Sequence, residues 1–138
     1  MIFDWADYLK LAKALQVNPE TPGPREASLR AAASRAYYAA FQCAIRFAEH
    51  EGFQPKYTGE DHWSIRRHFQ HYQPNQSATR GKIFTELGRM YDNRRMADYQ
   101  DELKRTSAAA LADLTIKLAR SILAKLSSLN TSENDASE

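Results

Sequence analysis

Several residue types that mark other classes of protein are scarce in this chain of 138 residues. The single cysteine, Cys43, excludes an intrachain disulfide and any metal site built from several cysteines. Glycine and proline occur five times each and lie between the periodic segments, without a glycine-rich phosphate loop. No apolar run approaches ~20 residues, so we expect no membrane span. The N-terminus carries Asp4 and Asp7 and does not resemble a signal peptide, which leaves the cytoplasm as the expected location.

The overall charge is also small, at +2, which argues against a general polyanion binder. The charges are nevertheless distributed unevenly. The stretch 56–95 contains eight lysines and arginines but four acidic residues, together with three of the four histidines. This distribution indicates either a basic surface in the middle of the chain or ordinary solvated helix faces.

The residues that are abundant favour helix, and their apolar members recur at helical spacing. The pattern predicts five helices, at about 4–16, 25–51, 61–72, 77–93 and 106–129. Residues 94–104 are charged and are expected to be partly irregular, and residues 73–76 interrupt the helical pattern. The polar segment 130–138 is expected to be disordered. We therefore predict one all-α domain over residues 1–129, a bundle of four to five helices.

The longest predicted helix, 25–51, combines an apolar stripe with a polar one. Its expected core stripe consists of Tyr37, Phe41 and Ile45. Arg35 and Gln42 share another face with Tyr38, and they lie ~10 Å apart along the helix axis because seven residues make nearly two turns.

An arginine within such an alanine-rich and tyrosine-rich helix needs a partner, because a buried, unpaired charge costs several kcal/mol. Three interpretations of Arg35 remain open. It pairs with an internal carboxylate, for which Asp98 is the candidate, or it lies in a subunit interface, or it lines an anion site.

Two segments resemble the HEPN family. Residues 26–41, which contain Ser34-Arg35-Ala36-Tyr37-Tyr38, resemble the signature helix of prokaryotic HEPN proteins. Residues 94–99, with the pattern R-x-x-A-D-Y, resemble a stretch that follows a later helix in the same branch. His62 stands where that branch often has a histidine before its third helix.

The resemblance implies a helical bundle that commonly forms homodimers and needs no metal or other cofactor. Many members are ribonucleases with an arginine and a histidine separated by four to six residues. Some are toxins paired with a nucleotidyltransferase antitoxin that can modify a tyrosine with AMP, and others are non-catalytic modules. We therefore expect a toxin-like or defence-associated protein with such a partner. The alternatives are a module that binds RNA, a nucleotide or a partner protein, and a purely structural bundle.

The ribonuclease chemistry explains the family motif. Arginine presents a positively charged fork to phosphate oxygens, and histidine transfers protons near neutral pH. Here Arg35 matches the motif, but Gln42 occupies the histidine position, and an amide cannot act as a general acid or base. His62 becomes an alternative proton-transfer residue if its helix folds against the helix that carries Arg35.

Further candidates complete the predicted site. The predicted catalytic set is Arg35, Gln42 and His62, and the predicted binding residues are Ser34, Tyr38, Arg66, Arg94 and Asp98. Arg66 and His71 also match the arginine–histidine spacing, although on a different helix from the family motif. No metal site is predicted, because His68 and His71 have no evident third ligand.

Overall fold

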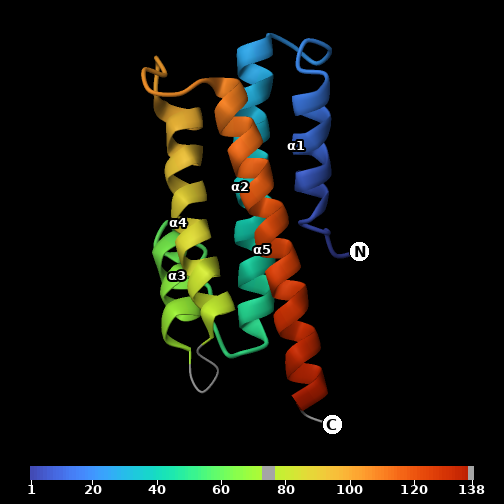
Figure 1. Cartoon of the computed structure of the whole chain (residues 1–138), viewed down its shortest axis with the longest axis vertical. Coiled ribbons are helices and arrows are strands. Elements are labelled where there is room, and N and C mark those ends of the chain that lie inside the picture. Colours follow the sequence, from blue (N-terminus) through green and yellow to red (C-terminus); the bar gives the residue numbers. More distant parts are fainter. Residues whose placement is uncertain (73–76, 137–138) are drawn as a thin grey trace.

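The computed structural model describes residues 1–72 and 77–136, with the backbone alone for 131–136. The described residues contain five helices and no strand, which confirms the predicted all-α bundle (Figure 1). The helices are α1 (Asp7–Val17), α2 (Arg25–Glu49), α3 (Asp61–His71), α4 (Ala78–Tyr99) and α5 (Ala108–Ala136).

Helix α2 is the centre of the bundle. Figure 1 shows α1 on one side of α2, α4 with α3 on the other, and α5 running along its length. Its alanines allow this close packing, since Ala32, Ala36, Ala40, Ala44 and Ala48 are fully buried. A half-exposed stripe remains on α2 between α1 and α3, and it contains Arg35, Tyr38, Gln42 and Arg46.

Helices α2 and α5 supply much of the apolar core. Tyr37, Phe41 and Ile45 are all buried, which confirms the core face of α2. On α5, Leu111, Ile122 and Leu126 are buried, but Leu114, at the same helical spacing, is 45% exposed. The small residues Ala112 and Ala119 face the core of the bundle instead, because α5 approaches the alanine-rich α2 closely.

Helix α4 is longer than the sequence pattern predicts. It continues to Tyr99, so the expected irregular structure from residue 94 onward was wrong as far as that residue. Arg94 and Ala97 are buried in this last section, and the packing of these side chains keeps the helix intact despite its charge. The interruption predicted at 73–76 lies outside the described residues.

The other helix ends differ by smaller amounts. Helix α1 begins at Asp7 rather than near residue 4, and the Asp4 carboxylate accepts a hydrogen bond from the Ala6 amide at 3.0 Å. Ser107 caps α5 by accepting from the Ala110 amide at 3.1 Å. Helix α5 continues past 129, the predicted domain boundary, to Ala136, and 137–138 lie outside the described residues.

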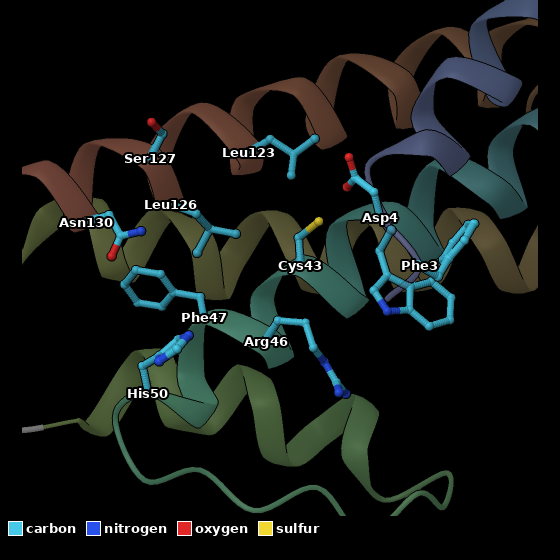
Figure 2. Close-up of a pocket in the computed structure, with 11 residues that line it drawn as sticks. Phe3, Asp4, Cys43, Arg46, Phe47, His50, Leu123, Leu126, Ser127 and Asn130 are labelled. Carbon is cyan, nitrogen blue, oxygen red and sulfur yellow. The ribbon is translucent and has the colours of Figure 1, made fainter. Parts of the chain in front are cut away.

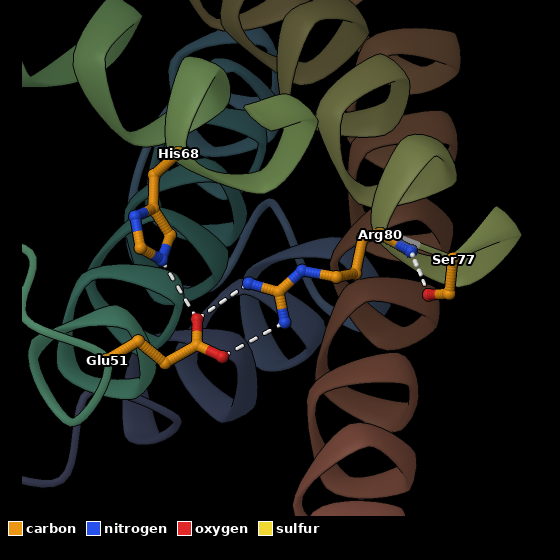
Figure 3. A network of polar contacts seen from close by, with 4 residues as sticks. All are labelled: Glu51, His68, Ser77 and Arg80. Carbon is orange, nitrogen blue, oxygen red and sulfur yellow. Dashed lines mark hydrogen bonds and ion pairs between the residues drawn. The ribbon is translucent and has the colours of Figure 1, made fainter. Parts of the chain in front are cut away.

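A buried ionic network joins the turn that follows α2 to α3 and α4 at one end of the bundle (Figure 3). Both oxygens of Glu51 accept from the Arg80 guanidinium, at 2.6 and 3.0 Å, and Oε1 also contacts His68 Nε2 at 2.8 Å. Burial alone would raise the pKa of Glu51, but the hydrogen bonds from Arg80 and His68 outweigh it and lower the pKa. Charge is therefore balanced where these three elements meet.

Candidate functional site

Arg35 is partly buried on the open stripe of α2, and aromatic rings surround its guanidinium. The guanidinium carbon lies 4.9 Å from the Tyr8 ring centre and 5.3 Å from that of Tyr38. Its hydrogen bond to Ser34 Oγ is long, at 3.5 Å. Arg35 forms no ion pair with any described carboxylate, which leaves most of its donors available to a ligand.

A direct pairing with Asp98, one of the three interpretations of Arg35 that the sequence left open, is replaced by an indirect connection. The Ser34 hydroxyl, which accepts from Arg35, donates to Asp98 Oδ2 at 3.2 Å. Arg94 Nη1 lies 3.5 Å from the same carboxylate oxygen. The structure thus brings four of the predicted residues together: Ser34 contacts both Arg35 and Asp98, and Asp98 also contacts Arg94.

Arg94 is 6% exposed and lies within a group of tyrosines. Its guanidinium carbon is 5.3 to 5.7 Å from four ring centres, those of Tyr37, Tyr38, Tyr91 and Tyr99. Burial opposes the charge of Arg94, but nearby Tyr38, Tyr99 and Asp98 outweigh it and raise the pKa of the guanidinium. The long contact with Asp98 is weak compensation for a buried cation, so the tyrosine rings stabilise much of this charge.

His62, the second residue of α3, packs directly on α2. Its ring stacks on Phe41 with the ring centres 4.5 Å apart, and Nδ1 is 2.5 Å from the Tyr37 hydroxyl oxygen. Burial, and then the charge of Arg94, lower the pKa of His62, against an opposing contribution from Asp61. The imidazole is therefore neutral at pH 7, the form that can accept a proton.

A cavity of about 330 Å³ separates α2 from the segment that leads into α3. Gln42 and His62 both line it, so the residue at the motif position and its proposed substitute face one space. Phe41, Ile45 and Pro55 contribute apolar walls. The condition for His62 to act beside α2, that its helix folds against α2, is met.

Arg66 contacts α4 rather than the stripe of α2. Its Nε donates to the Phe84 carbonyl at 3.4 Å, and its guanidinium lies against the rings of Trp63 and Phe84. Gly88 makes room for it, since a Cβ at Gly88 would overlap the guanidinium. The contacts of Arg66 therefore hold α3 against α4, and His71, its partner in the second motif match, is exposed at the end of α3.

Two contributors to the site were not identified from the sequence. Tyr8 comes from α1 and covers one side of Arg35. Tyr99 packs on Arg94 while remaining 71% exposed. The R-x-x-A-D-Y pattern contains Tyr99, but the pattern alone does not place its ring beside Arg94.

A second cavity, of about 340 Å³, lies between the N-terminal segment, α2 and α5 (Figure 2). Cys43, Phe47, Leu123 and Leu126 make it largely apolar, while the Arg46 guanidinium extends away from them. Burial, followed by the charge of Asp4, raises the pKa of Cys43 to about 11. The thiol therefore keeps its proton at neutral pH and is a poor nucleophile.

The part of the chain that the structure describes contains neither a candidate metal site nor a candidate membrane span. No three or more His, Cys, Asp or Glu side chains gather in a way that could hold a metal ion. No helix in that part of the chain combines the length and apolar character needed to cross a membrane.

No family model matches the chain, and neither a curated protein nor a solved structure matches it. The HEPN resemblance therefore rests on the residues themselves, and the function follows as a proposal from the geometry around Arg35.

Proposed function

We propose that the protein binds single-stranded RNA, with Arg35 contacting a backbone phosphate. The observation that carries the proposal is the guanidinium of Arg35, which is partly buried yet forms no ion pair with a described carboxylate. Planar, charged and already oriented by Tyr8 and Tyr38, it is suited to bidentate contact with phosphate oxygens.

The neighbours of Arg35 support a nucleic acid over a small inorganic anion. Arg94 adds positive charge, and Tyr38 and the exposed Tyr99 offer ring faces on which unpaired bases can stack. The resemblance to HEPN proteins, many of which act on RNA, favours RNA over DNA.

The test is fluorescence anisotropy with a labelled single-stranded RNA across a range of salt concentrations. Arg35→Gln should weaken binding about tenfold and reduce the salt dependence by about one phosphate contact. Arg120→Gln is the matched control, because Arg120 is exposed on α5. None of the residues that line the Gln42 cavity comes from that helix. Equal affinities for the two variants and the unchanged protein would contradict the proposal, as would tighter binding of the corresponding DNA.

Ribonuclease activity is the second candidate, and the position of His62 favours it. A neutral imidazole beside Gln42 could accept the proton of a ribose 2′-hydroxyl as the 2′-oxygen attacks the phosphorus, and return it to the 5′-oxygen as the P–O5′ bond breaks, while Arg35 stabilises the phosphate charge. The purified protein would then cleave RNA without a metal, and His62→Gln would abolish cleavage while leaving RNA binding in place. Intact RNA after long incubation with the unchanged protein would leave the binding function alone.

The homodimer and the nucleotidyltransferase partner are proposed on the resemblance only. Light scattering of the purified protein tests the first, and a small nucleotidyltransferase encoded beside this protein would support the second. Harmless overexpression of the protein alone would argue against a toxin.

A further inference from the structure

The cavity beside Gln42 has a one-sided set of hydrogen-bonding groups. Arg46 Nη2 lies 3.4 Å from Gln42 Oε1, and because arginine only donates, the amide oxygen must face it. The amide nitrogen of Gln42 is left with no partner among the described residues. Arg46 Nε is likewise buried without a partner there. The Arg46 guanidinium is engaged by Gln42 and, at 3.0 Å, by Glu49, so the unused donor that faces this cavity is the amide nitrogen of Gln42.

Two acceptor groups that line the cavity, the Asp61 carboxylate and Nδ1 of His62, already have partners. Both oxygens of Asp61 accept from backbone amides, those of Lys56 at 2.9 Å and Tyr57 at 2.8 Å, and Asp61 is only 4% exposed. The Nδ1 atom of His62 contacts the Tyr37 hydroxyl. A ligand edge that carries only acceptors would therefore fit, whereas one that needs an acceptor from the protein would lose a hydrogen bond.

The cavity also disfavours a second phosphate. The Asp61 carboxylate lines the cavity and would repel a bound anion, while Phe41, Ile45 and Pro55 provide apolar walls for a flat, neutral ring. Its volume of about 330 Å³ leaves room for a purine base.

We propose that this cavity binds a guanine base through the O6 and N7 edge, with a phosphate of the same strand on Arg35. That edge of guanine carries two acceptors, whereas the matching edge of adenine pairs the N7 acceptor with an amino donor. Arg35 and Gln42 lie ~10 Å apart along α2, a separation that a short single strand covers. This inference rests on the proposed RNA binding and adds base selectivity to it.

The experiment compares two RNA hexamers, UUUGUU and UUUAUU, by fluorescence anisotropy with the full chain. The unchanged protein should bind the guanine hexamer several-fold more tightly. Gln42→Leu should bring the ratio of the two affinities close to one, while Gln54→Leu, the same change at an exposed position, should preserve it. Gln42→Glu, of nearly the same shape but without the amide hydrogens, serves if the leucine variant does not fold.

An inosine hexamer, UUUIUU, sharpens the test because inosine keeps O6 and N7 but lacks the 2-amino group. It should bind like the guanine hexamer, and binding like the adenine hexamer would overturn the proposed edge. Equal affinities for guanine and adenine, or a preference that survives both Gln42 substitutions, would overturn the base site. If Arg35→Gln still weakened binding in that case, the proposed function would stand without it, whereas no salt-dependent binding of any hexamer would remove both.

Discussion

Arg80 and Arg35 lie in two regions of the bundle that treat a cation differently. Arg80, at 1% exposure, places both Nη atoms on Glu51, which also contacts His68 (Figure 3). Arg35 lies halfway along α2 with tyrosine rings at its sides and one long hydrogen bond to Ser34. The charge of an arginine is thus neutralised by a carboxylate in one region, whereas in the other it has no carboxylate partner among the described residues.

The difference separates structural from functional charge. A buried carboxylate–guanidinium pair is strongly destabilised when one partner is removed, since the other charge remains buried. A cation that contacts aromatic rings at a partly exposed position remains accessible to solvent. Its replacement therefore lowers the stability of the fold only slightly. We therefore expect stability to depend on the network at Glu51, and ligand binding to depend on Arg35.

The largest expected effect is on stability, from Glu51→Ala. The substitution leaves Arg80 buried without the Glu51 carboxylate, and we expect the free energy of unfolding in urea to fall by about 3–5 kcal/mol. Glu20→Ala is the control, because the Glu20–Arg25 pair is exposed and should leave stability unchanged. Equal losses in the two variants would remove the contrast between the regions.

The next largest expected effect is on RNA affinity, from a substitution close to Arg35. Asp98→Asn removes a negative charge that lies beside Arg94 and is linked to Arg35 through Ser34. RNA affinity should rise by about 1 kcal/mol, roughly fivefold, at low salt. Asp92→Asn, at an exposed position of α4, should change affinity less. A decrease in affinity with Asp98→Asn would instead indicate that Asp98 orients the site.

A smaller effect, on stability, is expected when Arg35 itself is replaced. Arg35→Met keeps much of the side chain's apolar length but loses the contacts of the cation with Tyr8 and Tyr38, which are worth about 0.5–1 kcal/mol at an exposed site. The unfolding free energy should therefore change by less than about 1 kcal/mol. Arg80→Met, measured alongside, should be far more destabilising, and a similar loss for both would show that Arg35 is structural.

The smallest effect is a pH dependence. The pKa of His62 is lowered in the folded protein, so the unfolded chain binds its proton first as the pH falls below about 6.5. Stability is thus fully present above that pH and is lost as the pH falls through the folded-state pKa. His62→Gln should flatten the unfolding free energy between about pH 7.5 and 5.5, and an unchanged slope would contradict the lowered pKa.

Several features of the fold followed from local patterns. Apolar spacing predicted all five helices and the buried face of α2, because helical periodicity and small alanine side chains act within a few residues. The end of α4 did not follow, since its charged last section remains helical only where Arg94 is buried among rings from α2 and α4. Tertiary packing overrode local composition at that point.

The candidate site divides in the same way. The sequence by itself determined that Arg35, Tyr38 and Gln42 share one face of a helix, and that Gln42 cannot transfer protons. Only the tertiary structure decided that Asp98 pairs with Arg94 and Ser34, that His62 faces the cavity beside Gln42, and that Arg35 has no carboxylate partner among the described residues. The physical reason is range: helical periodicity relates near neighbours, whereas a charge's partner depends on which distant segments pack beside it.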